Sequence, residues 1–216
     1  MLERIVIEQA VRDLRPDVAV LAMTAEGLVN GPGGEVTVKV PEGAAQDPHV
    51  EAWREAYRGF GAKPQRTRSS VDALLRRADA LPSINRVVDA YNAVSVEYVL
   101  PIGGEDLDAY QGAARLVRAT GDEPFDTVAG GEPATEHPAA GEVVWRDDLG
   151  VTCRRWNWRQ GVRTRITEST ENALFLLERL EPYPLERLHE AGEALAARLR
   201  EFSPDARIES RLIGGA

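Results

Sequence analysis

The sequence contains very little cysteine, histidine or lysine. Cys153 is the only cysteine, so the chain cannot form an internal disulfide or a zinc site built from several cysteines. The three histidines, His49, His137 and His189, lie far apart, and neither HExxH nor CxxC spacing occurs. Because transition-metal sites are built from such clusters, we expect no metal.

Motifs that bind nucleotides or supply a nucleophile are also missing. No GxGxxG sequence precedes a helix and no P-loop occurs, which argues against a nucleotide cofactor and against an NTPase. Neither a GxSxG elbow nor a cysteine–histidine signature is present. We expect no cofactor, and any hydrolysis would need a water molecule positioned by polar side chains or by the substrate itself.

A long hydrophobic run and an excess of positive charge are absent as well. The longest strongly apolar run, residues 18–23, is far too short to span a bilayer, and charged residues interrupt any signal-peptide core at the N-terminus. We therefore expect a cytoplasmic protein with no membrane partner. The formal net charge of −9 excludes a generally basic protein that coats nucleic acid, but it leaves a local basic site open.

The composition, with 43% hydrophobic and 28% charged residues in 216, is typical of a globular protein. We predict one domain over residues 1–216 and leave the oligomeric state open. Capping residues and helical spacing predict helices over residues 47–61, from 69 to before 82, over 86–99 and over 185–202.

Apolar or alternating runs predict strands over residues 4–8, 17–24, 36–40, 113–118, 143–147, 151–158 and 173–180, and an edge strand in the tail 204–216. Residues 147–150 predict a hairpin turn, and residues 129–141 a surface loop. Helices come first and strands follow without regular alternation, which favours an α+β fold with a largely antiparallel or mixed sheet.

Residues 151–167 (VTCRRWNWRQGVRTRIT) contain five arginines and no acid. An extended strand over 151–158 would place Trp156 and Trp158 on one face and Asn157 on the other. Arginines interleaved with aromatic side chains suit phosphates and stacked bases. An alternative that carries about equal weight is a strand whose tryptophans are core and whose arginines pair with surface acids. The RNA-binding candidates are Arg154, Arg155, Arg159, Arg163 and Arg165.

Residues 82–108 contain a polar set at helical spacing. Arg86, Asp89 and Asn92 follow one another at offsets of three, so they can share a helix face and line a pocket. Gly103 and Gly104 would let a ligand approach the backbone closely. From spacing alone, an ordinary Arg86–Asp89 ion pair and an asparagine bonded to backbone are the simpler interpretation.

Residues 164–178 (TRITESTENALFLLE) lead through turn residues into an apolar strand. Glu178 stands at the end of that strand, where it could orient a water molecule or hold an ammonium group. The alternative is a solvent-exposed acid, because acids are rarely buried deeply. Thr164, at the start of this segment, is included among the substrate-binding candidates.

Two long segments carry a family resemblance. Residues 81–112 (LPSINRVVDAYNAVSVEYVLPIGGEDLDAYQG) resemble the editing and tRNA-binding module of the phenylalanyl-tRNA synthetase beta subunit, called the B-three/B-four domain. Residues 141–178 (GEVVWRDDLGVTCRRWNWRQGVRTRITESTENALFLLE) resemble its free-standing relatives more closely. The resemblance covers residues 17–178, and no other synthetase module is visible.

The resemblance implies a three-layer α+β domain with a β-sandwich-like mixed sheet and flanking helices. In the synthetase, the module's pocket hydrolyses tyrosine wrongly esterified to phenylalanine tRNA. Arg86 and Asn92 match positions at that pocket, Gly103 stands where the synthetase has a histidine, and Glu178 is the nearest counterpart of the pocket glutamate after a shift of two residues.

These observations lead to the hypothesis of a trans-acting editing protein that binds the aminoacylated 3′ end of a tRNA and hydrolyses a mischarged ester. The catalytic candidates are Asn92, Asn157 and Glu178, and the substrate-binding candidates are Arg86, Gly103, Gly104, Trp156 and Thr164. Two alternatives remain: a non-catalytic RNA-binding module, to which the missing histidine points, and an amino-acid sensor, which the overall acidity favours.

Overall fold

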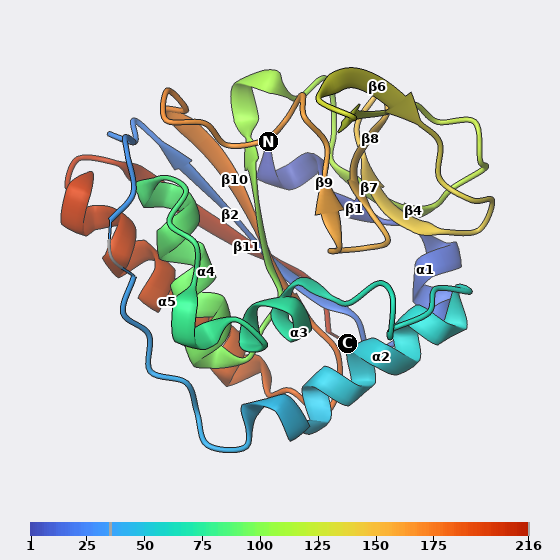
Figure 1. The fold of residues 1–216 in the computed structure, drawn as a ribbon, viewed down its shortest axis with the longest axis horizontal. Helices are drawn as coiled ribbons and strands as arrows, with labels where there is room; N and C mark the ends of the chain where they lie inside the picture. The colour runs from blue at the N-terminus through green and yellow to red at the C-terminus, as the bar shows by residue number, and fades with distance from the viewer. Residues whose placement is uncertain (35, 216) are drawn as a thin grey trace.

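The computed structural model describes residues 1–34 and 36–215 (Figure 1). Its helices are α1 (Gln9–Leu14), α2 (Pro48–Gly59), α3 (Ser70–Leu75), α4 (Arg86–Tyr98) and α5 (Leu185–Phe202), with short 3₁₀ turns at Leu2–Arg4, Ala44–Gln46, Ala78–Ala80 and Leu107–Ala109. Its strands are β1 (Val6–Ile7), β2 (Ala19–Glu26), β3 (Ile102–Asp106), β4 (Arg115–Arg118), β5 (Phe125–Ala129), β6 (Glu132–Glu136), β7 (Val143–Arg146), β8 (Val151–Arg154), β9 (Arg159–Gln160), β10 (Asn172–Arg179) and β11 (Arg207–Gly214).

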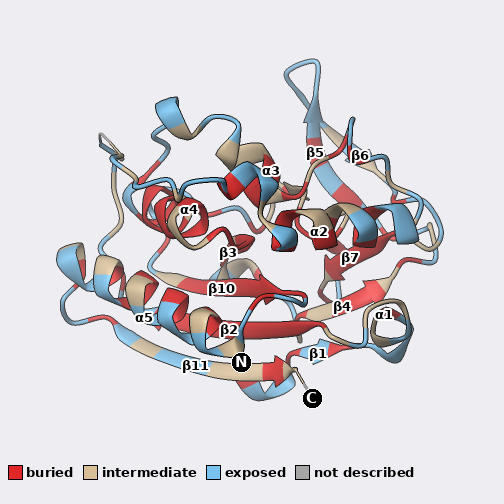
Figure 2. Ribbon diagram, turned by 90° about the horizontal axis from the view of Figure 1, so that it is seen from below, coloured by how far each residue is buried: buried red, intermediate tan, exposed pale blue. Residues whose placement is uncertain are grey.

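A four-stranded antiparallel sheet forms the centre of the molecule, in the order β11-β2-β10-β3. β2 and β10 are buried along almost their whole length (Figure 2), because packed side chains cover both of their faces. This explains why their sequences are continuous apolar runs rather than alternating ones. β11 is the edge strand predicted in the tail.

The second sheet has five strands in the order β1-β4-β7-β8-β9 and is mixed, because β1 pairs with β4 in parallel. The turn predicted at residues 147–150 connects β7 and β8, where the Asp147 side chain accepts hydrogen bonds from the backbone N–H groups of Leu149 and Gly150. The separate β5–β6 hairpin packs Phe125 against Val117, Val144 and Val151 of this sheet.

Strand alternation divides the core into two main clusters, one on each face of the four-stranded sheet. Leu21 and Phe175 face α4 and α5, where Leu188 and Leu195 pack against them. The opposite face points toward the five-stranded sheet and toward α2. Its cluster is built around Leu174, Leu176, Trp145, Trp53 and Trp156. The resulting order of helices, sheet and second sheet confirms the predicted three-layer α+β fold.

The capping signals predicted at the starts of α2 and α3 are confirmed. Asp47 accepts a hydrogen bond from the backbone N–H of His49 at 2.8 Å, with Pro48 in the first turn of α2. Ser69 caps α3 and Asn85 caps α4. These side chains satisfy backbone donors that have no partner inside the helix. No helix of the described residues is long and apolar enough to cross a membrane.

His49 is a buried polar contact between α2 and the sheets. Its Nδ1 lies 3.0 Å from the carbonyl oxygen of Val99, and its Nε2 accepts from the Trp53 indole at 3.0 Å and from the Leu180 backbone N–H at 3.2 Å. Burial lowers the pKa of His49 to about 4. The imidazole is therefore neutral at physiological pH and donates through Nδ1.

Three local predictions are wrong. Residues 36–40 form no strand, although valines alternate there, because no neighbouring strand pairs with them among the described residues. The segment 151–158 is not one strand: β8 ends at Arg154, and Arg155 and Trp156 then adopt left-handed backbone conformations with φ of 48° and 67°. The stretch 129–141, predicted as a loop, contains β6.

Candidate functional site

A cavity of about 220 Å³ lies between the two sheets. Its walls come from α3, α4, β3, β7, β8, β10 and the segment 156–160. Of the predicted site residues, Asn92, Gly103, Trp156, Asn157, Arg159 and Glu178 line it. The structure thus brings together side chains from segments that are far apart in the sequence.

Glu178 is the best-held carboxylate in this cavity. It is 1% exposed, and it lies on the β10 face that points toward the five-stranded sheet. Trp145 Nε1 donates to its Oε1 at 2.7 Å, and Asn157 Nδ2 donates to its Oε2 at 2.7 Å. Burial raises the pKa of Glu178 to about 7, although these donors oppose the shift. The alternative interpretation of Glu178, a solvent-exposed acid at the strand end, is therefore wrong.

Asn157 connects this carboxylate to the helical layer. Its Oδ1 accepts from the Tyr57 hydroxyl at 2.9 Å and from the backbone N–H of Ser70 at 3.4 Å, while its amide nitrogen serves Glu178. Three hydrogen bonds thus hold this amide in place, and they fix the orientation of the Glu178 carboxylate at the cavity.

Glu105 is a second buried carboxyl that the sequence analysis missed. It is 1% exposed and also lines the cavity, from β3. Burial raises the pKa of Glu105 to about 8, so a large share of this group is protonated at neutral pH. A signal was available, because residues two apart in a strand share a face and Gly103 was already predicted at the pocket.

Three buried polar atoms on the cavity walls lack a hydrogen-bond partner among the described residues: Glu105 Oε2, Ser70 Oγ and Trp156 Nε1. Buried polar groups in folded proteins almost always have a partner, because an unpaired one costs about 1–3 kcal/mol. These atoms, on three different walls, are the groups that a bound molecule can satisfy. The remaining walls are largely apolar or aromatic, as in small-molecule sites generally.

The two neighbouring glycines of β3 have different roles. A Cβ at Gly103 would meet only Gln160 Nε2, at 3.9 Å, so this glycine leaves the cavity open. A Cβ at Gly104 would lie 2.6 Å from Tyr91 Cε1 and 2.9 Å from Ile166 Cδ1. Gly104 therefore permits close packing against α4, and it is not among the residues that line the cavity.

Two further predicted residues lie outside the cavity. Arg86 is exposed at the start of α4 and lines a different hollow, beside Asp89 and Arg198. Thr164 is buried next to β3, where its carbonyl oxygen accepts from the Asp106 N–H at 2.7 Å. Sequence spacing places residues on one face of an element, but it does not tell which face meets the opposite sheet.

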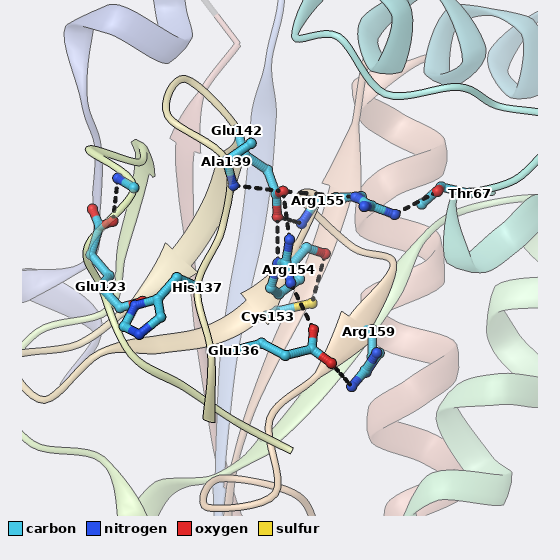
Figure 3. A network of polar contacts seen from close by, with 11 residues as sticks. Thr67, Glu123, Glu136, His137, Ala139, Glu142, Cys153, Arg154, Arg155 and Arg159 are labelled. Carbon is cyan, nitrogen blue, oxygen red and sulfur yellow. Dashed lines mark hydrogen bonds and ion pairs between the residues drawn. The ribbon is translucent and has the colours of Figure 1, made fainter. Parts of the chain in front are cut away.

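Arg154 and Arg159 belong to one ion-pair network (Figure 3). Arg154 is 6% exposed, and two of its nitrogens donate to the two carboxylate oxygens of Glu142 at 2.8 and 2.9 Å. Its third nitrogen donates to Glu136 at 2.9 Å. Arg159 donates to the other oxygen of Glu136 at 3.2 Å and to Thr127. These contacts fasten β6 to the sheet.

The guanidinium of Arg163 is also paired within the protein, because it donates to both carboxylate oxygens of Asp147 at 2.8 Å and to the Ala109 carbonyl oxygen. Arg165 is exposed and forms no ion pair within residues 1–34 and 36–215. Most of the arginines expected to bind RNA thus neutralise buried or half-buried acids, as the alternative interpretation held.

No group of three or more histidine, cysteine, aspartate or glutamate side chains within the described part of the chain is arranged to hold a metal ion. The polar groups of the cavity lining are the carboxyls of Glu105 and Glu178, three amides, two hydroxyls, three indole N–H groups and the guanidinium of Arg159. This donor set suits a small organic ligand with several hydrogen-bonding groups.

A family model described as the B3/4 domain matches residues 52–195. The chain belongs to the B3/4 domain family. The matched range contains every residue that lines the cavity, so the site lies inside this B3/4 domain. The resemblance drawn from residues 81–112 and 141–178 is thereby confirmed.

A solved structure described as an N-terminal fragment of the phenylalanyl-tRNA synthetase beta-subunit from Pyrococcus horikoshii is similar to this B3/4 domain protein. The sequence identity is 15% and the TM-score is 0.47. The similarity covers 94% of this chain and 49% of that chain, so this chain spans about half of that fragment's length. No curated protein matches this chain.

Proposed function

We propose that this B3/4 domain protein takes the aminoacyl group of a mischarged tRNA into the cavity between its sheets and hydrolyses the ester that joins it to the RNA. The observation that carries the proposal is the buried Glu178 carboxylate, held by Asn157 and Trp145 in a cavity that also contains polar atoms without a partner among the described residues, on Glu105, Ser70 and Trp156. The resemblance of residues 81–112 and 141–178 to an editing module supports the tRNA part.

In the proposed reaction, Glu178 accepts a proton from a water molecule as the water oxygen attacks the ester carbonyl carbon. The bond between that carbon and the ribose oxygen breaks, and the ribose oxygen takes up a proton. A general base works best when its pKa is close to the operating pH, and the pKa of Glu178, about 7, meets this condition. The products are a free amino acid and an uncharged tRNA.

Discrimination would come from the unpaired polar atoms. A side chain that supplies partners to Glu105 and Ser70 removes the cost of leaving them unpaired, whereas an apolar side chain of the same size does not. Sites built in this way reject the apolar analogue strongly. The structure therefore favours a substrate whose side chain carries a hydrogen-bonding group.

A second candidate function is an amino-acid sensor that binds no RNA. The observation that favours it is the pairing of Arg154, Arg159 and Arg163 with acids, which leaves few of the predicted RNA contacts free. A sensor would keep the cavity and its polar atoms but would have no surface for phosphates.

The test is a panel of tRNAs, each charged with a non-cognate amino acid, incubated with the purified protein. We expect at least one ester to disappear well above its spontaneous rate, and we expect Glu178→Gln to lower that rate about 10²- to 10⁴-fold. Glu190→Gln, an exposed substitution of the same kind on α5, serves as the control and should leave the rate unchanged.

If every charged tRNA in the panel decays at its spontaneous rate, the hydrolytic proposal is refuted. Thermal unfolding with free amino acids then separates the remaining functions, because a ligand that binds only the folded state raises the melting temperature. A shift with a free amino acid and no tRNA binding would identify the sensor. tRNA binding without hydrolysis would identify a non-catalytic RNA-binding module.

A further inference from the structure

A second hollow, a groove of about 440 Å³, lies beside the cavity. It runs between the connection from α2 to α3, residues 60–67, and the turn that follows β8. Trp158 lines both the groove and the cavity, so the two hollows meet at this side chain. No predicted role from the sequence accounts for the basic residues on the 60–67 side.

The groove carries positive charge that is not neutralised. Lys63 and Arg66 are exposed and form no ion pair within residues 1–34 and 36–215. Arg155 adds a third cation, which donates to Thr67 at 2.6 Å and pairs through its Nε with Glu142 at 3.7 Å, so only Lys63 and Arg66 contribute charge that no acid in the groove pairs with. Glu142 is the acidic residue among those that line the groove, and the buried Arg154 donates to both of its carboxylate oxygens. The whole chain has a net charge of −9, so a groove lined by exposed cations differs from the rest of the molecule.

The turn that separates the groove from the cavity has an uncommon backbone. Arg155 and Trp156 are consecutive non-glycine residues with left-handed conformations, each of which costs on the order of 1 kcal/mol. The turn sends the Arg155 side chain toward Thr67 in the groove (Figure 3), while the neighbouring Trp156 indole lines the cavity. Backbone strain of this kind persists where the surrounding structure holds the residues in place. Here the strained turn lies between the groove and the cavity.

We propose that this groove binds the phosphates of a single-stranded RNA 3′ end whose terminal group enters the cavity. The inference rests on the proposed function and deepens it by assigning the RNA contact to the exposed Lys63 and Arg66, beside Arg155, instead of to the buried and half-buried arginines that hold the strands together. A duplex cannot enter a cavity of about 220 Å³, whereas one strand end can be led into it along the groove.

Ammonium and guanidinium groups beside the cavity would supply the sequence-independent part of RNA binding, because they replace counterions at the phosphates. The negative charge over the rest of the chain repels RNA elsewhere and so directs it to this groove. Binding at this place therefore does not require an overall basic protein.

The test measures fluorescence anisotropy of a labelled RNA hairpin that ends in a single-stranded CCA 3′ overhang. The variant is Lys63→Glu combined with Arg66→Glu, and the matched control is Arg4→Glu combined with Arg200→Glu, which makes the same charge change at exposed residues outside the groove. We expect the groove variant to raise the Kd at least tenfold at about 0.1 M salt, and the control to raise it less than threefold.

The salt dependence gives a second readout. Each lost phosphate contact on a single strand lowers the slope of log K against log salt by about 0.7, so the groove variant should lose about 1.4. Equal losses in the two variants, no loss in the groove variant, equal binding of a blunt duplex, or no binding of the hairpin by the unmodified protein would each overturn the inference.

The failure of this inference differs from the failure of the proposed function. Hydrolysis of a charged tRNA by a protein whose groove variant binds the hairpin normally would reject the groove and keep the function. Groove-dependent binding without hydrolysis of any charged tRNA would keep the groove and reject the hydrolase.

Discussion

Replacing Glu105 with glutamine should make the stability of the protein less dependent on pH. Glutamine has nearly the same shape as protonated glutamic acid and cannot ionise. Glu105 is 1% exposed, and its pKa of about 8 in the folded chain compares with an ordinary value of 4.5. Between these two values, the unfolded chain loses the proton that the folded chain retains, so folding becomes less favourable as pH rises.

The size of the effect follows from the pKa difference. Each unit corresponds to 1.36 kcal/mol, so the stabilisation present below pH 4.5 falls by roughly 5 kcal/mol once the pH exceeds about 8. From pH 5 to pH 9 the loss attributable to this group is about 4 kcal/mol. Glu178 and His49 are present in both proteins, so the difference between the two curves isolates Glu105.

Urea unfolding followed by tryptophan fluorescence at pH 5 to 9 measures this difference. We expect the free energy of unfolding of the unmodified protein to fall by about 4 kcal/mol more than that of Glu105→Gln over this range, with the same dependence on urea in both. Curves that stay parallel within about 1 kcal/mol would show that Glu105 is hydrated or paired in solution, and would refute the reasoning about its burial.

Three further outcomes follow from the packing. Gly104→Ala should lower the free energy of unfolding in urea by about 1–3 kcal/mol, because its Cβ would overlap Tyr91 of α4. Gly103→Ala should change the free energy of unfolding little but weaken ligand binding, and equal losses of stability in the two variants would contradict the placement of these glycines on opposite faces of β3. Arg154→Ala should cost about 3–5 kcal/mol, because it removes the guanidinium that donates to both oxygens of the buried Glu142 carboxylate. The exposed Arg165→Ala should cost less than about 0.5 kcal/mol, and similar melting temperatures for the two variants would contradict this prediction. His49 should remain neutral in NMR titrations down to a pH near 4. The free energy of unfolding should fall as the pH drops below 6.5, because the histidine of the unfolded chain takes up a proton first. Titration of His49 at an ordinary pKa would show that the ring is not buried.

Much of the architecture could be predicted from the sequence, because the signals are local. Asp47, Ser69 and the periodic apolar positions of residues 185–202 mark helix starts and faces through contacts within a few residues. The turn at residues 147–150 is likewise fixed by Asp147, whose carboxylate binds the backbone of its own turn. Residues 36–40 show the limit, since an alternating pattern without a partner strand forms none.

The partners of the arginines could not be predicted in the same way. Arg154 pairs with acids 12 and 18 positions earlier in the chain, and Arg163 pairs with one 16 positions earlier. Glu136 ends β6, while Glu142 and Asp147 stand directly before and after β7, so pairing depends on sheet topology. The strand expected over 151–158 failed for a related reason, because the left-handed turn at Arg155 is fixed by contacts with Thr67 and with the core.

The sequence by itself determined the α+β layers, the helix caps and the presence of Asn92, Asn157 and Glu178 as polar residues near apolar strands. Only the tertiary structure decided that Asn157 and Glu178 meet, that Glu105 joins them, and that Arg86 does not. Burial is the physical reason: whether a carboxyl loses water and keeps its proton depends on how two sheets and several helices close around it, and no local pattern encodes that enclosure.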